Sequence, residues 1–117
     1  MNKSKGKIKL IVADVEGCLT PGKGRSFDIE SFAEIRAYCA EAKKGKKPPL
    51  VLCTGRPQPY AEAIIQNLGA FFPNFPSVVE NGCFLYDPIE DVIIPNPAIK
   101  GKEKKLREIK SFLLERL

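Results

Sequence analysis

The fold is decided by the stretch IKLIVADVEGCLT, residues 8–20. Its apolar run, residues 10–13, ends at the carboxylate of Asp14, and a second carboxylate follows at Glu16. A short continuous apolar run of this kind predicts a strand that is buried on both faces. Carboxylates directly after a buried strand disfavour packing, but they suit a strand end that faces a ligand crevice. The stretch therefore predicts a buried strand near residues 8–13, with a ligand site at its carboxyl end.

A second strand is predicted where another apolar run, residues 49–53, ends in the polar segment Thr54-Gly55-Arg56. The sequence between the two runs has helical periodicity from a cap at Ser26 or Asp28 to about residue 42. Strand, helix and strand at this spacing form a βαβ unit, whose strands are parallel and whose crossover is right-handed. The acidic pair and Thr54 are therefore expected at the same edge of the sheet.

Beyond the second strand, the sequence predicts another helix, over residues 57–67, and then a β-hairpin. The apolar residues that share one face of this helix are expected to be buried: Ala61, Ile64, Ile65 and Leu68. The dipeptide Asn81-Gly82 separates two apolar segments, 77–80 and 83–86, which is a strong signal for a tight two-residue hairpin turn. A further short strand is predicted at residues 91–94.

The first stretch resembles the first motif of haloacid-dehalogenase-like (HAD) phosphatases, Asp-x-Asp-Gly-Thr-Leu/Val-Thr. The chain matches this motif at Asp14, Gly17 and Thr20. It departs from the motif at Glu16, which replaces the second aspartate, and at Cys18, which replaces the first threonine. The enolase-phosphatases of the same family carry Glu at the second acidic position, so the resemblance accommodates Glu16.

Two later segments extend the resemblance in the order that the family has. Thr54-Gly55-Arg56 is similar to the second motif, a Thr or Ser at the end of the second strand. Residues 78–88, VVENGCFLYDP, are similar to the segment that leads into the large α/β cap of the sugar-phosphate phosphatases. The resemblance implies an α/β fold: a HAD-like Rossmannoid parallel sheet with flanking helices, shortened, plus a β-hairpin. It implies one partial domain over residues 1–117, in which residues 77–95 form the hairpin and lead into the cap.

The resemblance also implies a chemistry for each motif residue. Asp14 would be the nucleophile, giving an aspartyl-phosphate that water then cleaves. Glu16 would act as general acid and base, and Asp14 and Glu16, the latter through its backbone carbonyl, would hold Mg²⁺ against the phosphoryl group. The hydroxyl of Thr54 and the backbone N–H groups of Gly55 and Arg56 would bind the phosphoryl oxygens.

Purely structural interpretations of these residues stay open. Asp14 could cap a turn, Glu16 could pair with a nearby lysine, and Thr54 could be a polar strand terminus. Residues 17–23 also match the nucleotide-binding pattern G-x-x-x-x-G-K, but Gly24 stands where that loop needs Ser or Thr.

Two parts of the family's catalytic machinery are not recognised in these 117 residues. They are the lysine that stabilises the aspartyl site and the late acid pair that completes the Mg²⁺ site, both of which follow the cap in this subgroup. Asp87 and Asp91 have a spacing that could imitate the acid pair, but we favour their assignment to the segment leading into the cap. Two functions remain open: a Mg²⁺-dependent phosphomonoester hydrolase, or the nucleophile-bearing part of one, and a non-catalytic domain of the same fold that acts in binding or assembly.

The composition excludes several kinds of protein. No apolar run is long enough to cross a membrane, so no membrane association is expected. Histidine is absent, which excludes His-based triads and His–metal sites. The four cysteines form no CxxC pair, so we expect reduced cysteines and a cytoplasmic location.

The charge pattern favours a small anionic substrate, such as a sugar phosphate. The net charge is +5, and lysines cluster at residues 3–9, 43–47 and 100–105. No aromatic residue interleaves with these lysines, which argues against a nucleic-acid partner. The final helix, predicted from about residue 101, has an apolar face that a partial core would leave uncovered, so we expect self-association into a homo-oligomer.

Overall fold

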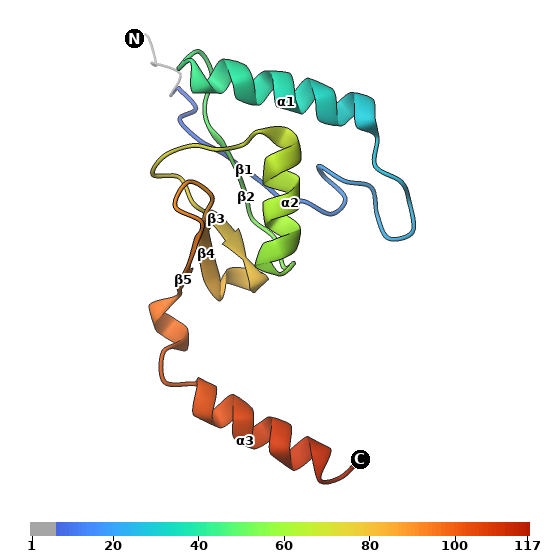
Figure 1. Ribbon diagram of the computed structural model, residues 1–117, viewed down its shortest axis with the longest axis vertical. Helices are drawn as coiled ribbons and strands as arrows, with labels where there is room; N and C mark the ends of the chain where they lie inside the picture. Colours follow the sequence, from blue (N-terminus) through green and yellow to red (C-terminus); the bar gives the residue numbers. More distant parts are fainter. Residues whose placement is uncertain (1–6) are drawn as a thin grey trace, which may run out of the picture.

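The structure is a computed structural model that describes residues 7–117, so the lysines of the first cluster that precede residue 7 lie outside the described residues. Strands, α-helices and short 3-10 helices follow one another along the chain (Figure 1). In order they are β1 (Ile11–Ala13), α1 (Ile29–Lys43), β2 (Leu50–Leu52), α2 (Gln58–Leu68), β3 (Ser77–Val79), η1 (Glu80–Gly82), β4 (Phe84–Asp87), β5 (Val92–Pro95), η2 (Pro97–Ile99) and α3 (Glu103–Leu114).

The predicted βαβ unit is confirmed. β1 and β2 pair in parallel, with Val12 opposite Val51. β3 continues the parallel arrangement through a bridge between Cys53 and Val78, next to which the N–H of Thr54 donates to the Val78 carbonyl at 2.9 Å. β4 and β5 then extend the array in antiparallel fashion. The carboxyl ends of β1, β2 and β3 consequently meet at one edge.

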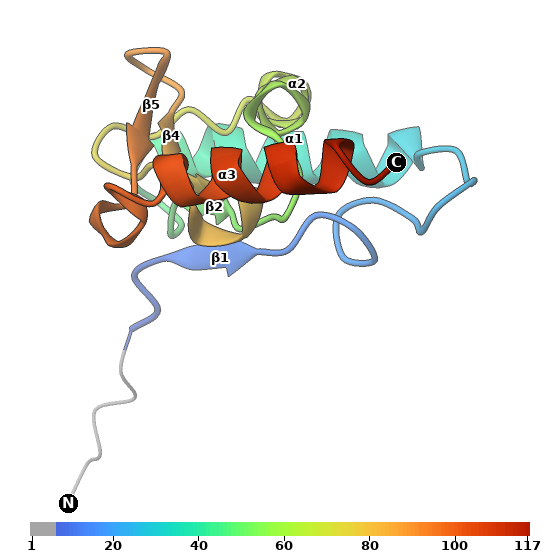
Figure 2. The same cartoon turned by 90° about the horizontal axis from the view of Figure 1, so that it is seen from below.

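The core lies between the sheet and the two helices α1 and α2, which Figure 2 shows on the same side of β1 and β2. Asp28 begins α1, because its Oδ1 accepts a hydrogen bond from the Glu30 N–H at 3.1 Å. Gly69 ends α2 in the left-handed conformation. The stripe predicted for α2 is confirmed, since each of its members is buried: Ala61, Ile64, Ile65 and Leu68.

The prediction that the first strand is buried on both faces is wrong. Val12 in the middle of β1 is 55% exposed, and Leu10 just before the strand is exposed as well. The reason is that α1 and α2 cover one face only, and β2 is the one strand that pairs with β1 among residues 7–117. The run is apolar on both faces, but the described part of the chain covers a single face.

The predicted two-residue turn at Asn81-Gly82 is also wrong, although the hairpin itself forms. Four residues connect β3 to β4, and Glu80, Asn81 and Gly82 all have positive φ angles, of 50°, 56° and 87°. The N–H of Glu80 donates to the carbonyl of Arg56 at 3.1 Å, and that of Asn81 donates to the carbonyl of Thr54 at 3.4 Å. These tertiary hydrogen bonds hold the turn against the end of β2, which a local turn signal cannot anticipate.

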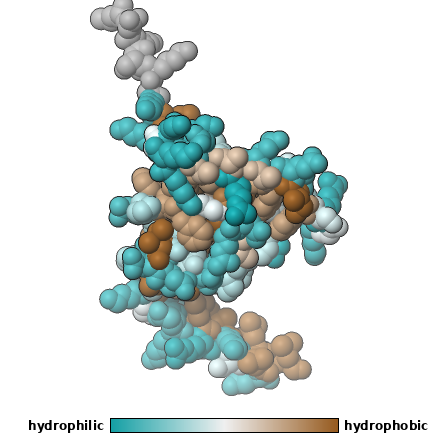
Figure 3. Space-filling view, turned by 45° about the horizontal axis from the view of Figure 1, so that its top comes forward, coloured by the Kyte–Doolittle hydropathy of each residue, from teal (hydrophilic) through white to brown (hydrophobic). Residues whose placement is uncertain are grey.

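The helix α3 stands apart from the rest of the molecule (Figure 1) and buries none of its residues. It begins two residues later than predicted, because η2 and a short turn precede it. Figure 3 shows a hydrophobic surface at this end of the molecule. Within residues 7–117, the model contains no helix with the length and apolar character needed to span a membrane.

Candidate functional site

A cavity of about 590 Å³ opens at the carboxyl edge of the sheet. It brings together Asp14 from the end of β1, Thr54 and Gly55 from the end of β2, and Asn81 from η1. The predicted meeting of Asp14 and Thr54 is therefore observed. It follows from the parallel pairing of β1 and β2, whose ends lie side by side.

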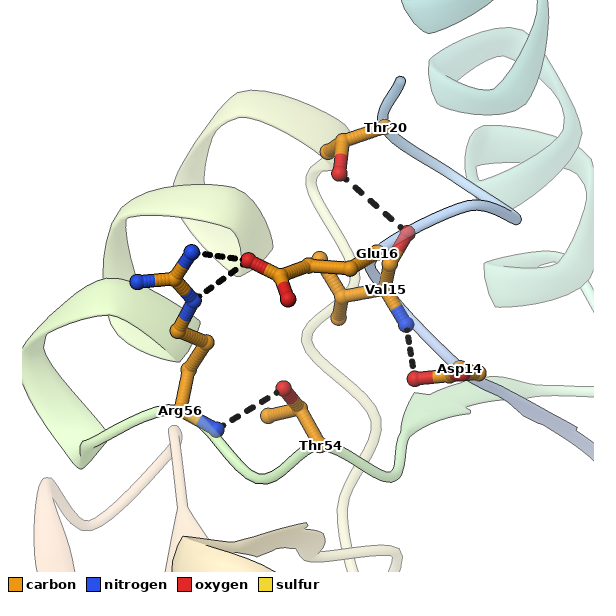
Figure 4. Close-up of polar contacts among 6 residues, drawn as sticks. All are labelled: Asp14, Val15, Glu16, Thr20, Thr54 and Arg56. Atoms are coloured by element: carbon orange, nitrogen blue, oxygen red, sulfur yellow. Dashed lines mark hydrogen bonds and ion pairs between the residues drawn. The ribbon is translucent and has the colours of Figure 1, made fainter. Parts of the chain in front are cut away.

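Asp14 begins a compact loop that returns the chain towards the sheet. Its Oδ1 accepts a hydrogen bond from the Val15 N–H at 2.8 Å (Figure 4). Val15 is fully buried and its carbonyl accepts the N–H groups of Leu19 and Thr20, each at 2.9 Å. Gly17 has a φ of 78°, which a residue with a side chain adopts at a cost. The loop is thus anchored in the core by Val15, while the Asp14 side chain stays exposed beside the cavity.

Glu16 points away from the cavity that Asp14 lines. Its Oε1 accepts hydrogen bonds from both Nε and Nη2 of Arg56 (Figure 4). The guanidinium of Arg56 also lies over the ring of Tyr60, 5.0 Å from the ring centroid. Both charged side chains are about half exposed. The structure therefore joins Glu16 and Arg56 to each other and leaves them outside the group formed by Asp14, Thr54 and Gly55.

Thr54 is the buried polar residue of the site. Its Oγ1 accepts a hydrogen bond from the Arg56 N–H at 3.1 Å, just before Pro57 and Gln58 begin α2. The hydroxyl proton of Thr54 is not used in that bond and can be donated to an anion in the cavity. The Arg56 N–H, predicted to bind phosphoryl oxygens, is directed at Thr54 instead, whereas Gly55 lines the cavity.

Asn81 is a site residue that sequence reasoning missed, because Asn81-Gly82 was interpreted as a turn signal. A Cβ atom placed on Gly55 would lie only 2.6 Å from the Asn81 Oδ1. The side chain of Asn81 therefore occupies the space directly above Gly55, at the wall of the cavity. The positive φ angles of Glu80 and Asn81 are held by hydrogen bonds to Arg56 and Thr54, which no local sequence signal indicates.

The residues of the site fit Mg²⁺ in part. Among residues 7–117 no group of three or more His, Cys, Asp or Glu side chains could hold a metal ion. Asp14 offers a hard carboxylate ligand beside the cavity. Mg²⁺ is commonly held in this way, by one or two carboxylates with water in the remaining positions.

Asp87 and Asp91, whose spacing could imitate an acid pair, have structural partners. Asp87 Oδ1 accepts the N–H of Ile89 at 2.9 Å, and Asp91 Oδ1 accepts the hydroxyl of Tyr86 at 2.9 Å. These bonds shape the turn between β4 and β5, away from the cavity of Asp14. The assignment of this segment to the hairpin is consistent with these contacts.

Comparisons with known proteins address the fold. No protein-family model matches the sequence, and no curated protein matches it. A haloacid dehalogenase-like hydrolase from B. subtilis has a TM-score of 0.60 and 25% identity over 93% of this chain and 34% of its own. A protein from Thermoplasma acidophilum has a TM-score of 0.60 and 26% identity, over 91% and 43% of the two chains. A haloacid dehalogenase-like hydrolase from Bacteroides thetaiotaomicron has a TM-score of 0.59 and 20% identity, over 77% and 32%.

This chain spans less than half of the length of each of these similar proteins. The resemblance drawn from the sequence motifs is confirmed for the fold. The chain has the fold of the haloacid dehalogenase-like hydrolases.

Proposed function

We propose that this chain carries the nucleophile-bearing part of a Mg²⁺-dependent phosphomonoester hydrolase. One observation carries the proposal: Asp14 and Thr54, from the ends of two adjacent parallel strands, line the same cavity. A carboxylate and a hydroxyl in this relation can attack a phosphoryl group and hold its oxygens at the same time.

In the proposed reaction, a carboxylate oxygen of Asp14 attacks phosphorus and the bond from phosphorus to the leaving alcohol oxygen breaks. Water then cleaves the aspartyl-phosphate and regenerates the Asp14 carboxylate. Thr54 donates its hydroxyl proton to a phosphoryl oxygen, and the Gly55 N–H donates to the same group. Mg²⁺, held by Asp14 and the backbone carbonyl of Glu16, would neutralise part of the phosphoryl charge when bound.

Glu16 is the proposed general acid for the leaving oxygen and general base for water. Its carboxylate is bound by Arg56, so it can reach the leaving group only after that pair opens. An anionic substrate competes with Glu16 for the guanidinium, and its arrival would free the carboxylate for proton transfer. The proposed substrates are small phosphorylated compounds of the sugar-phosphate class, and the proposed location is the cytoplasm, which suits the free thiols of all four cysteines.

A second function is supported by two specific observations. The described residues contain no cluster of three metal-ligating side chains, and Glu16 is engaged with Arg56. Both favour a non-catalytic domain, acting in binding or assembly, for these 117 residues on their own.

Calorimetric titration with Mg²⁺ distinguishes the two functions, and an assay with p-nitrophenyl phosphate tests whether these 117 residues suffice for turnover. For the hydrolase proposal we expect weak Mg²⁺ binding that Asp14→Asn reduces by about tenfold or more, since the ion loses its carboxylate ligand. Glu34→Gln, which changes an exposed carboxylate on α1, is the matched control and should bind as the parent does. Equal binding by Asp14→Asn and the parent would refute the metal site. We expect negligible turnover from this chain alone, because losing one charged catalytic element commonly raises the barrier by several kcal/mol.

A further inference from the structure

One face of the sheet is apolar, and within residues 7–117 it is exposed at β1, β4 and β5, whereas Val51 in its β2 part is buried. Paired residues on neighbouring strands lie on the same face, so the register defines a continuous row of side chains opposite α1 and α2. We call this row the open face: Val12, Val51, Cys53, Val78, Leu85 and Ile94. Val12 and Ile94, at its two ends, are about half exposed.

The helix α3 is the second uncovered apolar surface. It has 12 residues, and its large apolar side chains are exposed, with Leu106 at 64% and Leu113 at 55%. Isolated helices of this length are marginal in water, so α3 depends on packing against a partner. Figure 3 shows its hydrophobic side chains at the end of the molecule.

The connection between β5 and α3 directs the helix away from the open face of its own chain, since Figure 2 shows α3 on the side of β1 where α1 and α2 lie. Asn96 fixes this connection at three points. Its N–H donates to the Cys83 carbonyl at 2.8 Å, its side-chain amide donates to the Gly82 carbonyl at 2.9 Å, and its Oδ1 accepts the Ala98 N–H at 3.0 Å. Pro97 stiffens the same turn, and α3 follows it after Lys100, Gly101 and Lys102.

The two chain segments that carry the β3–β5 part of the open face and α3 have opposite net charges. Residues 77–99, which form β3 to β5, contain four acidic residues and no basic one. Residues 100–117, which form α3 and its flanks, contain seven basic and three acidic residues. By the strand register, Asp87 lies on the open face beside Leu85, so the β4–β5 end of this face has a charge that would attract a basic amphipathic helix.

We propose that α3 of one copy packs on the open face of a second copy and receives the second copy's α3 in return. This isologous exchange covers both uncovered surfaces with a single two-fold interface. It does not rest on the proposed phosphatase activity. The occupant of the open face is α3 of the second copy, with Leu113 and Leu106 against Leu85 and Ile94.

The test is the oligomeric state of the full chain, measured by sedimentation velocity and light scattering across a concentration series. We expect a dimer whose dissociation constant rises with ionic strength, because complementary charges contribute. Leu113→Glu on the helix and Leu85→Lys on the sheet should each raise that constant by more than about tenfold, since each places a charge in an apolar contact. Ile94→Lys repeats the sheet test at a second position.

Two matched controls and a mixing experiment make the assignment specific. Ile93→Lys lies on β5 but faces the other side of the sheet, and Ser111→Gln lies on the polar side of α3; both should dimerise as the parent does. A mixture of Leu113→Glu and Leu85→Lys keeps one intact helix–sheet contact and should form a heterodimer that neither variant forms alone. A parent chain that stays monomeric at all concentrations would overturn the proposal, as would dimers that survive both interface variants.

Discussion

Glu16 and Arg56, forty residues apart in the sequence, bind each other at the carboxyl edge of the sheet. The resemblance to the family implies that Glu16 acts as general acid and base and that the backbone N–H of Arg56 binds the phosphoryl group. In the structure the two side chains form an ion pair, and the guanidinium of Arg56 also packs over the ring of Tyr60. Glu16 cannot take its proposed role without breaking this pair, whereas the backbone N–H of Arg56 is engaged separately, by Thr54 Oγ1.

The pair should therefore contribute little to stability. Both side chains are about half exposed, and ion pairs of this kind contribute roughly 0.2–1 kcal/mol. In a double-mutant cycle of Glu16→Gln and Arg56→Gln, measured by urea unfolding, we expect a coupling free energy in this range that decreases with salt. A coupling above about 2 kcal/mol would show that the pair is a structural element rather than one that a substrate can open.

Gly55→Ala should disturb the cavity through Asn81. The added methyl group would lie 2.6 Å from the Asn81 Oδ1, so the side chain of Asn81 must move away from the end of β2. Overpacking of this kind typically lowers the free energy of unfolding by about 1–3 kcal/mol. We expect a loss at the lower end of this range, because the flexible side chain of Asn81 can move. The measurement is urea unfolding together with the NMR signals of the Asn81 side-chain amide.

Gly22→Ala is the matched control for that experiment. A Cβ at Gly22 would meet no atom within 4 Å, and its φ is not positive, so we expect unchanged or slightly higher stability. If Gly55→Ala were as stable as Gly22→Ala and left the Asn81 signals in place, the close approach of η1 to Gly55 would not exist in solution.

The sequence predicts the parts of this fold that local patterns determine. The βαβ unit, the cap at Asp28 and the buried stripe of α2 follow from spacing, side-chain hydrogen bonding and periodicity, and the structure confirms each of them. The meeting of Asp14 and Thr54 follows from the parallel strands alone. Chain direction and strand order are enough to place two strand ends together.

The remaining features depend on contacts between distant segments. The exposure of Val12 depends on which elements cover β1. The apolar run alone does not indicate whether one face or both are covered. The turn after β3 is set by hydrogen bonds to Thr54 and Arg56 rather than by Asn81-Gly82. The sequence does not determine which basic side chain pairs with Glu16, because any nearby cation could form the ion pair. In each case the deciding partner is far away in the sequence.

Ile65→Ala should destabilise the chain strongly. Ile65 is only 1% exposed and packs in the core between α2, α1 and the sheet. Truncation of such a residue to Ala typically lowers the free energy of unfolding by about 2–5 kcal/mol, through lost apolar contact and the cavity left behind. Ile93→Ala, at a half-exposed position of β5, is the control and should change stability by less than about 0.5 kcal/mol. Similar losses in the two variants, measured by urea unfolding, would contradict the assignment of the core to this side of the sheet.

Tyr86→Phe should remove a pH dependence at high pH. Burial of Tyr86, together with its hydrogen bond to Asp91 at 2.9 Å, raises its pKa to about 12. Since this value lies above that of the unfolded chain, near 10, the stabilisation by Tyr86 is complete below about pH 10 and is lost as the pH rises towards 12. The Phe variant lacks both the hydrogen bond and the titration. It should be less stable than the parent by about 1 kcal/mol at neutral pH, and its stability should fall less steeply between pH 10 and 12.

Tyr60→Phe, which removes a hydroxyl at a half-buried position of α2, is the control, and urea unfolding at several pH values is the measurement. If Tyr86→Phe and the parent lost stability in parallel above pH 10, the hydroxyl of Tyr86 would not be the buried proton donor that the structure shows.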